Sequence, residues 1–382
     1  MKSEFFKTSR IPPRFAVFFV SIAAAGITCL TEAGPNQDSA RTFLTTSFGL
    51  SGTDVARLDA GQVVSRTLDS DHAREVATLG IVRIATTPEQ YVTRLADITT
   101  FKRTDNVLQI GTFSDPPHAG DVAALTLDDA DVRQLQACQV DDCGLRISAD
   151  AIRQFSRMVD WRGGDATSRV TRLMHQFLVD YVARYQESGA PALMQYADSS
   201  PNVDIRTEFA ALVDGDRRPW RHLDDLREHV LEYPHDRVGA TDMIYWSKER
   251  VYKRPVISIT HVSIVRAADY APVRFAIASK QIYAMHYFDA SLGLTLLVPD
   301  PSSSSPATFV VYVNRSRIDL FDGALGRVAR RIVSGKRGRW LPPSSSACNA
   351  SWAPRKPAPV PPHDLISSPR HAAAQVPSQT PC

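Results

Sequence analysis

The sequence predicts an α+β fold, in which two separated β regions form one antiparallel sheet and a block of helices lies between them. Alternating, β-branched segments occur near residues 62–85 and again between residues 243 and 316. The intervening stretch at about 145–235 shows helical spacing of its apolar residues instead. A final amphipathic pattern at 322–336 predicts a C-terminal helix that packs against the sheet and closes it.

Both ends of the 382-residue chain differ from its centre. Basic residues precede an apolar run from Phe15 to Leu30, and small residues follow it, which is the layout of a secretory signal peptide at 1–33. The run is shorter than the roughly 20 residues of a membrane span, so cleavage is favoured over an N-terminal anchor. The Pro/Ser-rich composition of 341–382 predicts a disordered tail. We therefore expect a folded domain at 40–340 in an exported protein that is periplasmic or associated with the cell envelope.

Charge and cysteine content narrow the class further. The net charge of +3 at pH 7 is too small to indicate nucleic acid as a partner. Cys138 and Cys143 would lie in a compartment where disulfides persist, so their spacing predicts a local disulfide, with two free buried thiols as the alternative. The spacing is not that of a zinc site or a redox pair, and no metal or cofactor is predicted.

The sequence of the first β region predicts a hairpin followed by a short helix. Segments 62–68 and 75–85 are extended and are joined by a polar turn. Thr87–Gln90 is a capping box with Pro88 at the first helical position, which predicts a helix start. Another strand is expected around 107–113.

The middle of the chain is helical. His222 and His229 share a helical face and His235 lies just beyond, which raises the question of a metal site. Neither an i,i+4 pair nor a zincin motif accompanies them, so histidines that are incidental to a surface helix are the favoured interpretation. The segments with helical spacing are 151–158, 165–187, 204–213 and 222–233.

The last third returns to sheet. Four antiparallel strands are expected there, separated by loops rich in Pro, Ser, Ala and Asp. The arginines of the closing helix at 322–336 are also typical of helices that lie on an anionic membrane surface. Burial of its apolar stripe against the sheet is the simpler account. The four strands are expected at 243–249, 256–265, 275–298 and 308–316.

Two stretches carry a resemblance to a known superfamily. In 81-IVRIATTPEQYVTRLADI-98 a strand runs into a Pro-initiated helix, and in 308-TFVVYVNRSRIDLFDGALGRVARRIV-333 a last strand runs into a closing helix. This order resembles the helix-grip fold of the START-like (SRPBCC) superfamily, in which a curved antiparallel sheet wraps a C-terminal helix around a cavity. The resemblance covers two pieces of the chain, about 60–113 and 243–336. It implies binding of a lipid or another hydrophobic small molecule, and the helical block would be an insertion or a lid.

Polar residues within the 275–298 segment are the candidates for a head-group site. Strand alternation puts Lys280 and His286 on the expected core face, and Tyr283 on the other. A histidine buried among hydrogen-bonded neighbours is the alternative for His286, and a solvent-exposed strand end is the alternative for Arg315. The predicted ligand-binding residues are His261, Lys280, Tyr283, His286 and Arg315.

Three function classes remain open. The first is binding of a hydrophobic small molecule or lipid. The second is a cell-envelope hydrolase with His261 or His286 as its base, which requires a Ser or Cys beside that ring and a carboxylate behind it. The third is a structural or interaction module, which requires a filled interior. No nucleophile elbow, phosphate loop or dinucleotide fingerprint supports catalysis, and the sequence leaves the oligomeric state open.

Overall fold

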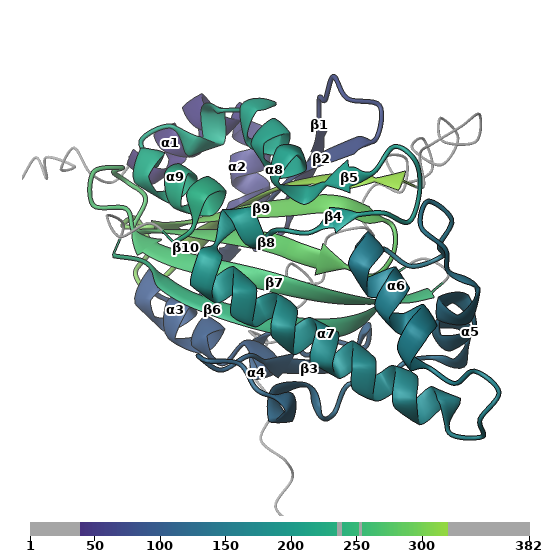
Figure 1. Ribbon diagram of the computed structural model, residues 1–382. Coiled ribbons are helices and arrows are strands. Elements are labelled where there is room, and N and C mark those ends of the chain that lie inside the picture. Colours follow the sequence, from purple (N-terminus) through teal and green to yellow (C-terminus); the bar gives the residue numbers. More distant parts are fainter. Residues whose placement is uncertain (1–38, 235–238, 252–253, 320–382) are drawn as a thin grey trace, which may run out of the picture.

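A computed structural model describes residues 39–234, 239–251 and 254–319. It contains one curved, eight-stranded antiparallel sheet with helices on both faces, so the predicted α+β class is confirmed (Figure 1). The sheet is open, because β1 and β3 form its two edges. The expected signal peptide, closing helix and C-terminal tail lie outside the described residues. Within the described ranges, no helix is long and apolar enough to cross a membrane.

The first β region has the predicted hairpin and helix. Strands β1 and β2 pair in register Val64↔Ile81. The Thr87 hydroxyl accepts from the Gln90 N–H and the Gln90 side chain accepts from the Thr87 N–H, so the capping box forms and starts α3. The elements are α1 Ser39–Phe48, α2 Gly52–Asp59, β1 Val64–Leu68, β2 Glu75–Ile84, α3 Pro88–Ala96, α4 Ile98–Phe101 and β3 Val107–Thr112.

A helical block separates β3 from the next long strand, and Figure 1 shows α6 to α9 in front of the sheet. The apolar stripe of α7 packs on the sheet, with the Phe177 ring 5.9 Å from that of Tyr283. The predicted disulfide joins Cys138 to Cys143 between α5 and α6. The elements are η1 Ala119–Val122, α5 Asp129–Ala137, α6 Ala149–Met158, α7 Ala166–Ser188, η2 Ala190–Ala192, β4 Gln195–Tyr196, β5 Val203–Asp204, α8 Ile205–Asp214, η3 Arg218–Trp220 and α9 Asp224–Glu232.

The C-terminal β region is a five-stranded meander rather than four strands. The 275–298 segment is a hairpin, because the chain reverses between β8 and β9 with Tyr287 at φ 67°. The last strand pairs with β2 in register Val310↔Val82, which joins the two β regions into one sheet. The sheet order is β1-β2-β10-β9-β8-β7-β6-β3. The strands are β6 Thr241–Val251, β7 Arg254–Arg266, β8 Phe275–Ala284, β9 Phe288–Pro299 and β10 Thr308–Ile318.

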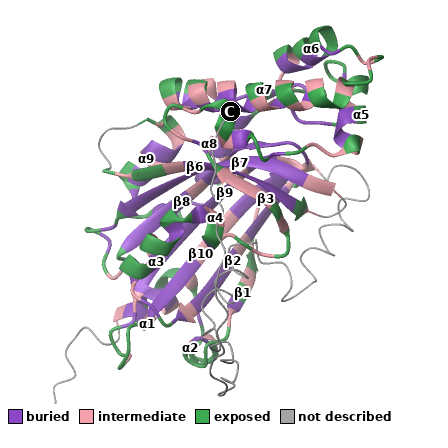
Figure 2. Cartoon of the chain, turned by 90° about the horizontal axis from the view of Figure 1, so that it is seen from below, coloured by how far each residue is buried: buried purple, intermediate pink, exposed green. Residues whose placement is uncertain are grey.

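Each face of the sheet has its own apolar core. The larger core lies under the helical block and includes Ile257 and Ile259 of β7. The smaller core lies under α3 and α4 and includes Val262 and Ile264 of the same strand. Figure 2 shows purple, buried residues along most of the strands. Because both faces are covered, polar residues that point from the strands are buried and need partners.

Candidate functional site

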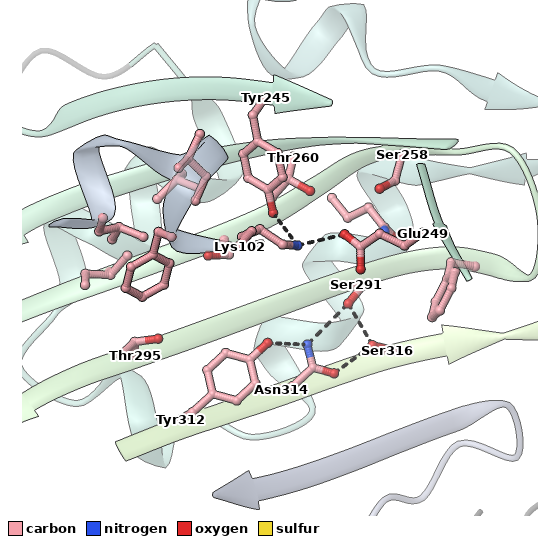
Figure 3. A pocket seen from close by; sticks show the side chains of 18 of the residues that line it. Lys102, Tyr245, Glu249, Ser258, Thr260, Ser291, Thr295, Tyr312, Asn314 and Ser316 are labelled. Atoms are coloured by element: carbon pink, nitrogen blue, oxygen red, sulfur yellow. Dashed lines mark hydrogen bonds and ion pairs between the residues drawn. The ribbon is translucent and has the colours of Figure 1, made fainter. Parts of the chain in front are cut away.

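A pocket of about 180 Å³ lies on the sheet face that carries α3 and α4, opposite the helical block (Figure 3). It is half-open to solvent. A structural or interaction module, which requires a filled interior, does not predict such a cavity. Its walls come from two helices and five strands. The lining residues are Tyr91, Leu95, Ile98, Phe101, Lys102, Tyr245, Glu249, Val251, Val256, Ser258, Thr260, Val262, Ile277, Ser279, Gln281, Phe288, Ser291, Thr295, Tyr312, Asn314 and Ser316.

One end of the pocket is apolar because of how α3 and α4 meet the sheet. Tyr91 and Leu95 are four residues apart, so they share the face of α3 that is turned to the strands. The rings of Tyr91 and Phe101 pack edge to face with centroids 5.4 Å apart. Together with Val262 and Ile277 they form an apolar wall.

The rest of the pocket is lined by hydroxyl and amide groups that recur at every second position of the strands. Ser291 and Ser316 face each other across β9 and β10, with their oxygens 2.7 Å apart. The Asn314 amide donates to the Ser291 hydroxyl and to the Tyr312 hydroxyl, each at 3.2 Å. These bonds are drawn in Figure 3. Gly293 leaves room for the Tyr312 ring, because a Cβ at this glycine would lie 2.8 Å from the ring's hydroxyl.

An internal ion pair lies at the edge of this polar surface. The Lys102 ammonium donates to Glu249 Oε1 at 2.9 Å and to the Tyr245 hydroxyl at 3.1 Å. Burial opposes both charges, but the pairing outweighs it, so the pKa of Lys102 is raised and the pKa of Glu249 is lowered. Both groups are therefore charged at neutral pH and neutralise each other.

One acceptor in the pocket lacks a hydrogen-bond partner in the part of the chain that the structure describes. The Gln281 side-chain oxygen is buried, and no hydrogen bond to it is found among the described residues. A buried polar atom without a partner costs free energy that a donor on a bound molecule recovers. The pocket thus offers an apolar wall, a neutral hydrogen-bonding surface and one open acceptor, a combination suited to an uncharged amphipathic ligand.

None of the five residues predicted to bind a ligand lines this pocket. Arg315 is buried and paired with Glu75, so it is not an exposed strand end. His286 lies in the turn after β8, and its Nε2 is 3.1 Å from Asp131 Oδ1 of α5. This contact matches the alternative that we gave for His286, a buried and hydrogen-bonded ring.

The other three predicted residues lie together under the helical block. Pairing skips Ile282, where β8 bulges, so Lys280 and Tyr283 both point to the helix-covered face. The Tyr283 hydroxyl is buried and has no hydrogen-bond partner within the described part of the chain. His261 lies opposite Lys280 in the register of β7 and β8.

The hydrolase hypothesis required a nucleophile on one nitrogen of a histidine and a carboxylate on the other. His261 Nε2 is 2.9 Å from Asp242 Oδ1, and the Ser263 hydroxyl is 3.4 Å from the same nitrogen. The other ring nitrogen faces the Tyr185 hydroxyl at 3.0 Å. The serine and the carboxylate are thus on one side of the ring, which is not the geometry of a catalytic triad.

Comparison with known proteins gives no relative to guide the assignment. The chain matches no protein-family model, no curated protein and no solved structure. The site is therefore interpreted from its own geometry.

The pocket residues were missed because small polar side chains in a strand carry a weak signal. The sequence does contain one. Ser258 and Thr260 lie two positions apart in β7, and Ser279 and Gln281 lie two positions apart in β8, so the members of each pair are on the same face of their strand. A hydroxyl or amide at alternate positions of several strands indicates that one sheet face is polar at its centre. The predicted ligand-binding residues are charged or aromatic instead, and none of them lines the pocket.

Proposed function

We propose that the protein binds a small, uncharged amphipathic molecule in the pocket beneath α3 and α4. The apolar part of the ligand packs against Tyr91, Leu95 and Ile277, and its polar group reaches the hydroxyl and amide surface. The observation that carries this proposal is the Gln281 oxygen, which lacks a partner among the described residues, inside a pocket whose other end is apolar. A ligand with a hydrogen-bond donor next to an apolar body satisfies both ends.

The size of the pocket limits the ligand. Its volume of about 180 Å³ is below the roughly 300–1,000 Å³ of pockets for drug-sized molecules. An apolar cavity of roughly 150 Å³ holds one benzene molecule. We therefore propose a ligand whose enclosed part is about the size of an aromatic ring or a short acyl segment, with the remainder in the open side of the pocket.

Two further features support a START-like, exported binding protein. The two pieces that resemble the helix-grip fold form one curved sheet, because β10 pairs with β2. The helical block lies on the opposite face from the pocket, so it is an addition to the sheet rather than a lid on this site. The disulfide between Cys138 and Cys143 is typical of an oxidising compartment outside the cytoplasm.

The test has two stages. The purified protein is first examined by native mass spectrometry for small molecules that are released on denaturation. It is then titrated with 1-aminoanthracene, which has a flat apolar body and one amino donor, while fluorescence is followed. We expect saturable binding to a single site. If the fluorescence rises only in proportion to the dye, the proposed function is wrong.

Two variants locate the site. Ser279→Phe places a ring in the pocket and should abolish binding, whereas Ser65→Phe, the same change on an exposed position of the edge strand β1, should leave it intact. Gln281→Leu removes the open acceptor. It should weaken binding about tenfold, which corresponds to about 1.4 kcal/mol, without lowering the melting temperature, since the Gln281 oxygen accepts no hydrogen bond from the described residues. Binding that is unaffected by both pocket variants would place the dye elsewhere.

A further inference from the structure

A second polar cluster lies on the opposite face of the sheet, under α9. Asp242 of β6 pairs with Ser263 and Ile244 pairs with His261, so Asp242 and His261 are diagonal neighbours on one face. His229 reaches the same point from α9. The Nε2 atoms of His261 and His229 lie 2.9 and 3.0 Å from Asp242 Oδ1.

The surroundings hold these groups in place and leave one side open. The two histidines are 2 % and 3 % exposed, whereas 26 % of the Asp242 side chain is exposed. The Tyr233 ring packs against both imidazoles, with centroids 4.5 Å from His261 and 5.3 Å from His229. The Tyr185 hydroxyl is 3.0 Å from His261 Nδ1 and fixes the orientation of that ring. Metal-binding histidines are typically held in this way through their second nitrogen.

We propose that His229, Asp242 and His261 bind a divalent transition-metal ion, with zinc as the preferred metal. One ligand atom from each residue lies within 4.8 Å of the other two, so a single ion can contact all three. Imidazole ligands favour zinc and its neighbours in the transition series, whereas calcium and magnesium take oxygen ligands. Three protein ligands leave a fourth position on the exposed side for water or another small ligand.

The two spacings between Asp242 Oδ1 and the imidazole nitrogens need only a small change for binding. Zinc bonds of about 2.0–2.1 Å in a tetrahedral arrangement place ligand atoms about 3.3 Å apart. The present spacing of 2.9–3.0 Å therefore has to widen by a few tenths of an ångström. A histidine that binds a metal through Nε2 carries its ring proton on Nδ1. At His261 the Nδ1–H group then donates to the Tyr185 hydroxyl.

Sequence spacing did not reveal this cluster, because its members come from a helix and two strands. His222, which shares a helical pattern with His229, is exposed and contacts Tyr270 instead. His235 lies outside the described residues. The second imidazole and the carboxylate are supplied by β7 and β6, and the fold brings them together.

The experiment uses the full chain without an affinity tag, with Cys29, Cys348 and Cys382 replaced by serine so that cysteine thiols outside the disulfide cannot bind metal. Protein stripped with a chelator is titrated with Zn²⁺ in competition with a chromophoric chelator. We expect one ion per chain and a higher melting temperature of the zinc-loaded protein. Replacing zinc by Co²⁺ should give the visible absorption of a four- or five-coordinate cobalt site with nitrogen and oxygen ligands.

Variants decide whether the cluster is the site. His229→Gln and Asp242→Asn keep side chains that can hydrogen-bond, and each should weaken Zn²⁺ binding at least tenfold. His286→Gln is the matched control, because His286 is also buried beside one aspartate but has no second histidine as a neighbour in the described structure. Its Zn²⁺ affinity should equal that of the parent. Absence of stoichiometric binding, or equal loss in all three variants, would overturn the proposal and leave the cluster as a hydrogen-bond network. Neither outcome affects dye binding in the pocket.

Discussion

Replacing Lys280 by methionine should change how the stability of the protein depends on pH. Lys280 is 2 % exposed and its ammonium donates to the Val230 carbonyl at 2.6 Å. The rings of Phe209 and Tyr185 lie 5.0 and 5.7 Å from the nitrogen. Burial lowers the pKa of Lys280 to about 7, and the attraction of Glu232 offsets only part of this effect.

The direction of the change in the free energy of unfolding follows from the pH range over which the folded and the unfolded state each hold the Lys280 proton. Below pH 7 both states are protonated, and the folded state carries the full cost of burying an ammonium group. Between pH 7 and about 10.5 only the unfolded chain keeps the proton, so the free energy of unfolding rises with pH. The slope reaches about 1.4 kcal/mol per pH unit, and the full difference between the two pKa values corresponds to about 5 kcal/mol.

Urea unfolding of both proteins between pH 6 and 10, with a chelator present, tests this calculation. Relative to Lys280→Met, the parent should gain about 3.5 kcal/mol between pH 7 and pH 10. At pH 6 the variant should be the more stable protein, because it buries no ammonium group. The difference should be less than about 5 kcal/mol, because the variant loses the Lys280 hydrogen bond to the Val230 carbonyl, at a cost of about 1 kcal/mol. Parallel curves over the whole range would show that the Lys280 proton is not lost near pH 7 in the folded state.

Two further substitutions test the packing of the helical block. Gly189 ends α7 at φ 65° and ψ −134°, and a Cβ there would lie 1.6 Å from the Tyr233 carbonyl oxygen. Gly189→Ala should therefore lower the free energy of unfolding in urea by at least about 3 kcal/mol, whereas Gly164→Ala, with open space at its Cβ, should not. His286→Leu removes the partner that the buried Asp131 carboxylate has among the described residues, at a cost of about 3–5 kcal/mol, so the melting temperature should fall by about 6 °C or more. The double variant that also carries Asp131→Leu should regain most of the lost melting temperature. If His286→Leu alone melts within about 2 °C of the parent, the burial argument is contradicted.

Local signals in the sequence were sufficient for the elements that depend on local chemistry. The capping box at Thr87–Gln90 and the turn between β1 and β2 are satisfied by residues a few positions apart. The disulfide is likewise local. The 275–298 hairpin was predicted as one continuous strand, because a turn made by Tyr287 at positive φ has no glycine or proline to mark it.

The candidate sites could not be predicted to the same extent, because both depend on strand register. The face to which a side chain points follows from alternation only until the first bulge. Ile282 interrupts the pairing of β8, so Lys280 and Tyr283 share a face although their positions differ by an odd number. Likewise, nothing in the sequence near Asp242 indicates that His229 and His261 lie beside it.

The two proposed sites differ in what satisfies their polar groups, and this difference is the physical reason for assigning different ligands to them. Adjacent residues of β7 face both sites, Thr260 toward the pocket and His261 toward the cluster. In the pocket, Gln281 presents an acceptor that lacks a partner among the described residues, which calls for an organic donor. In the cluster, one nitrogen of each imidazole lies beside the Asp242 carboxylate. These three groups have electron pairs that can bind a cation in place of the hydrogen bonds between them. Since a single strand carries both sets of contacts, a shift of β7 on occupation of one site would change affinity at the other, and any such coupling must be equal in both directions.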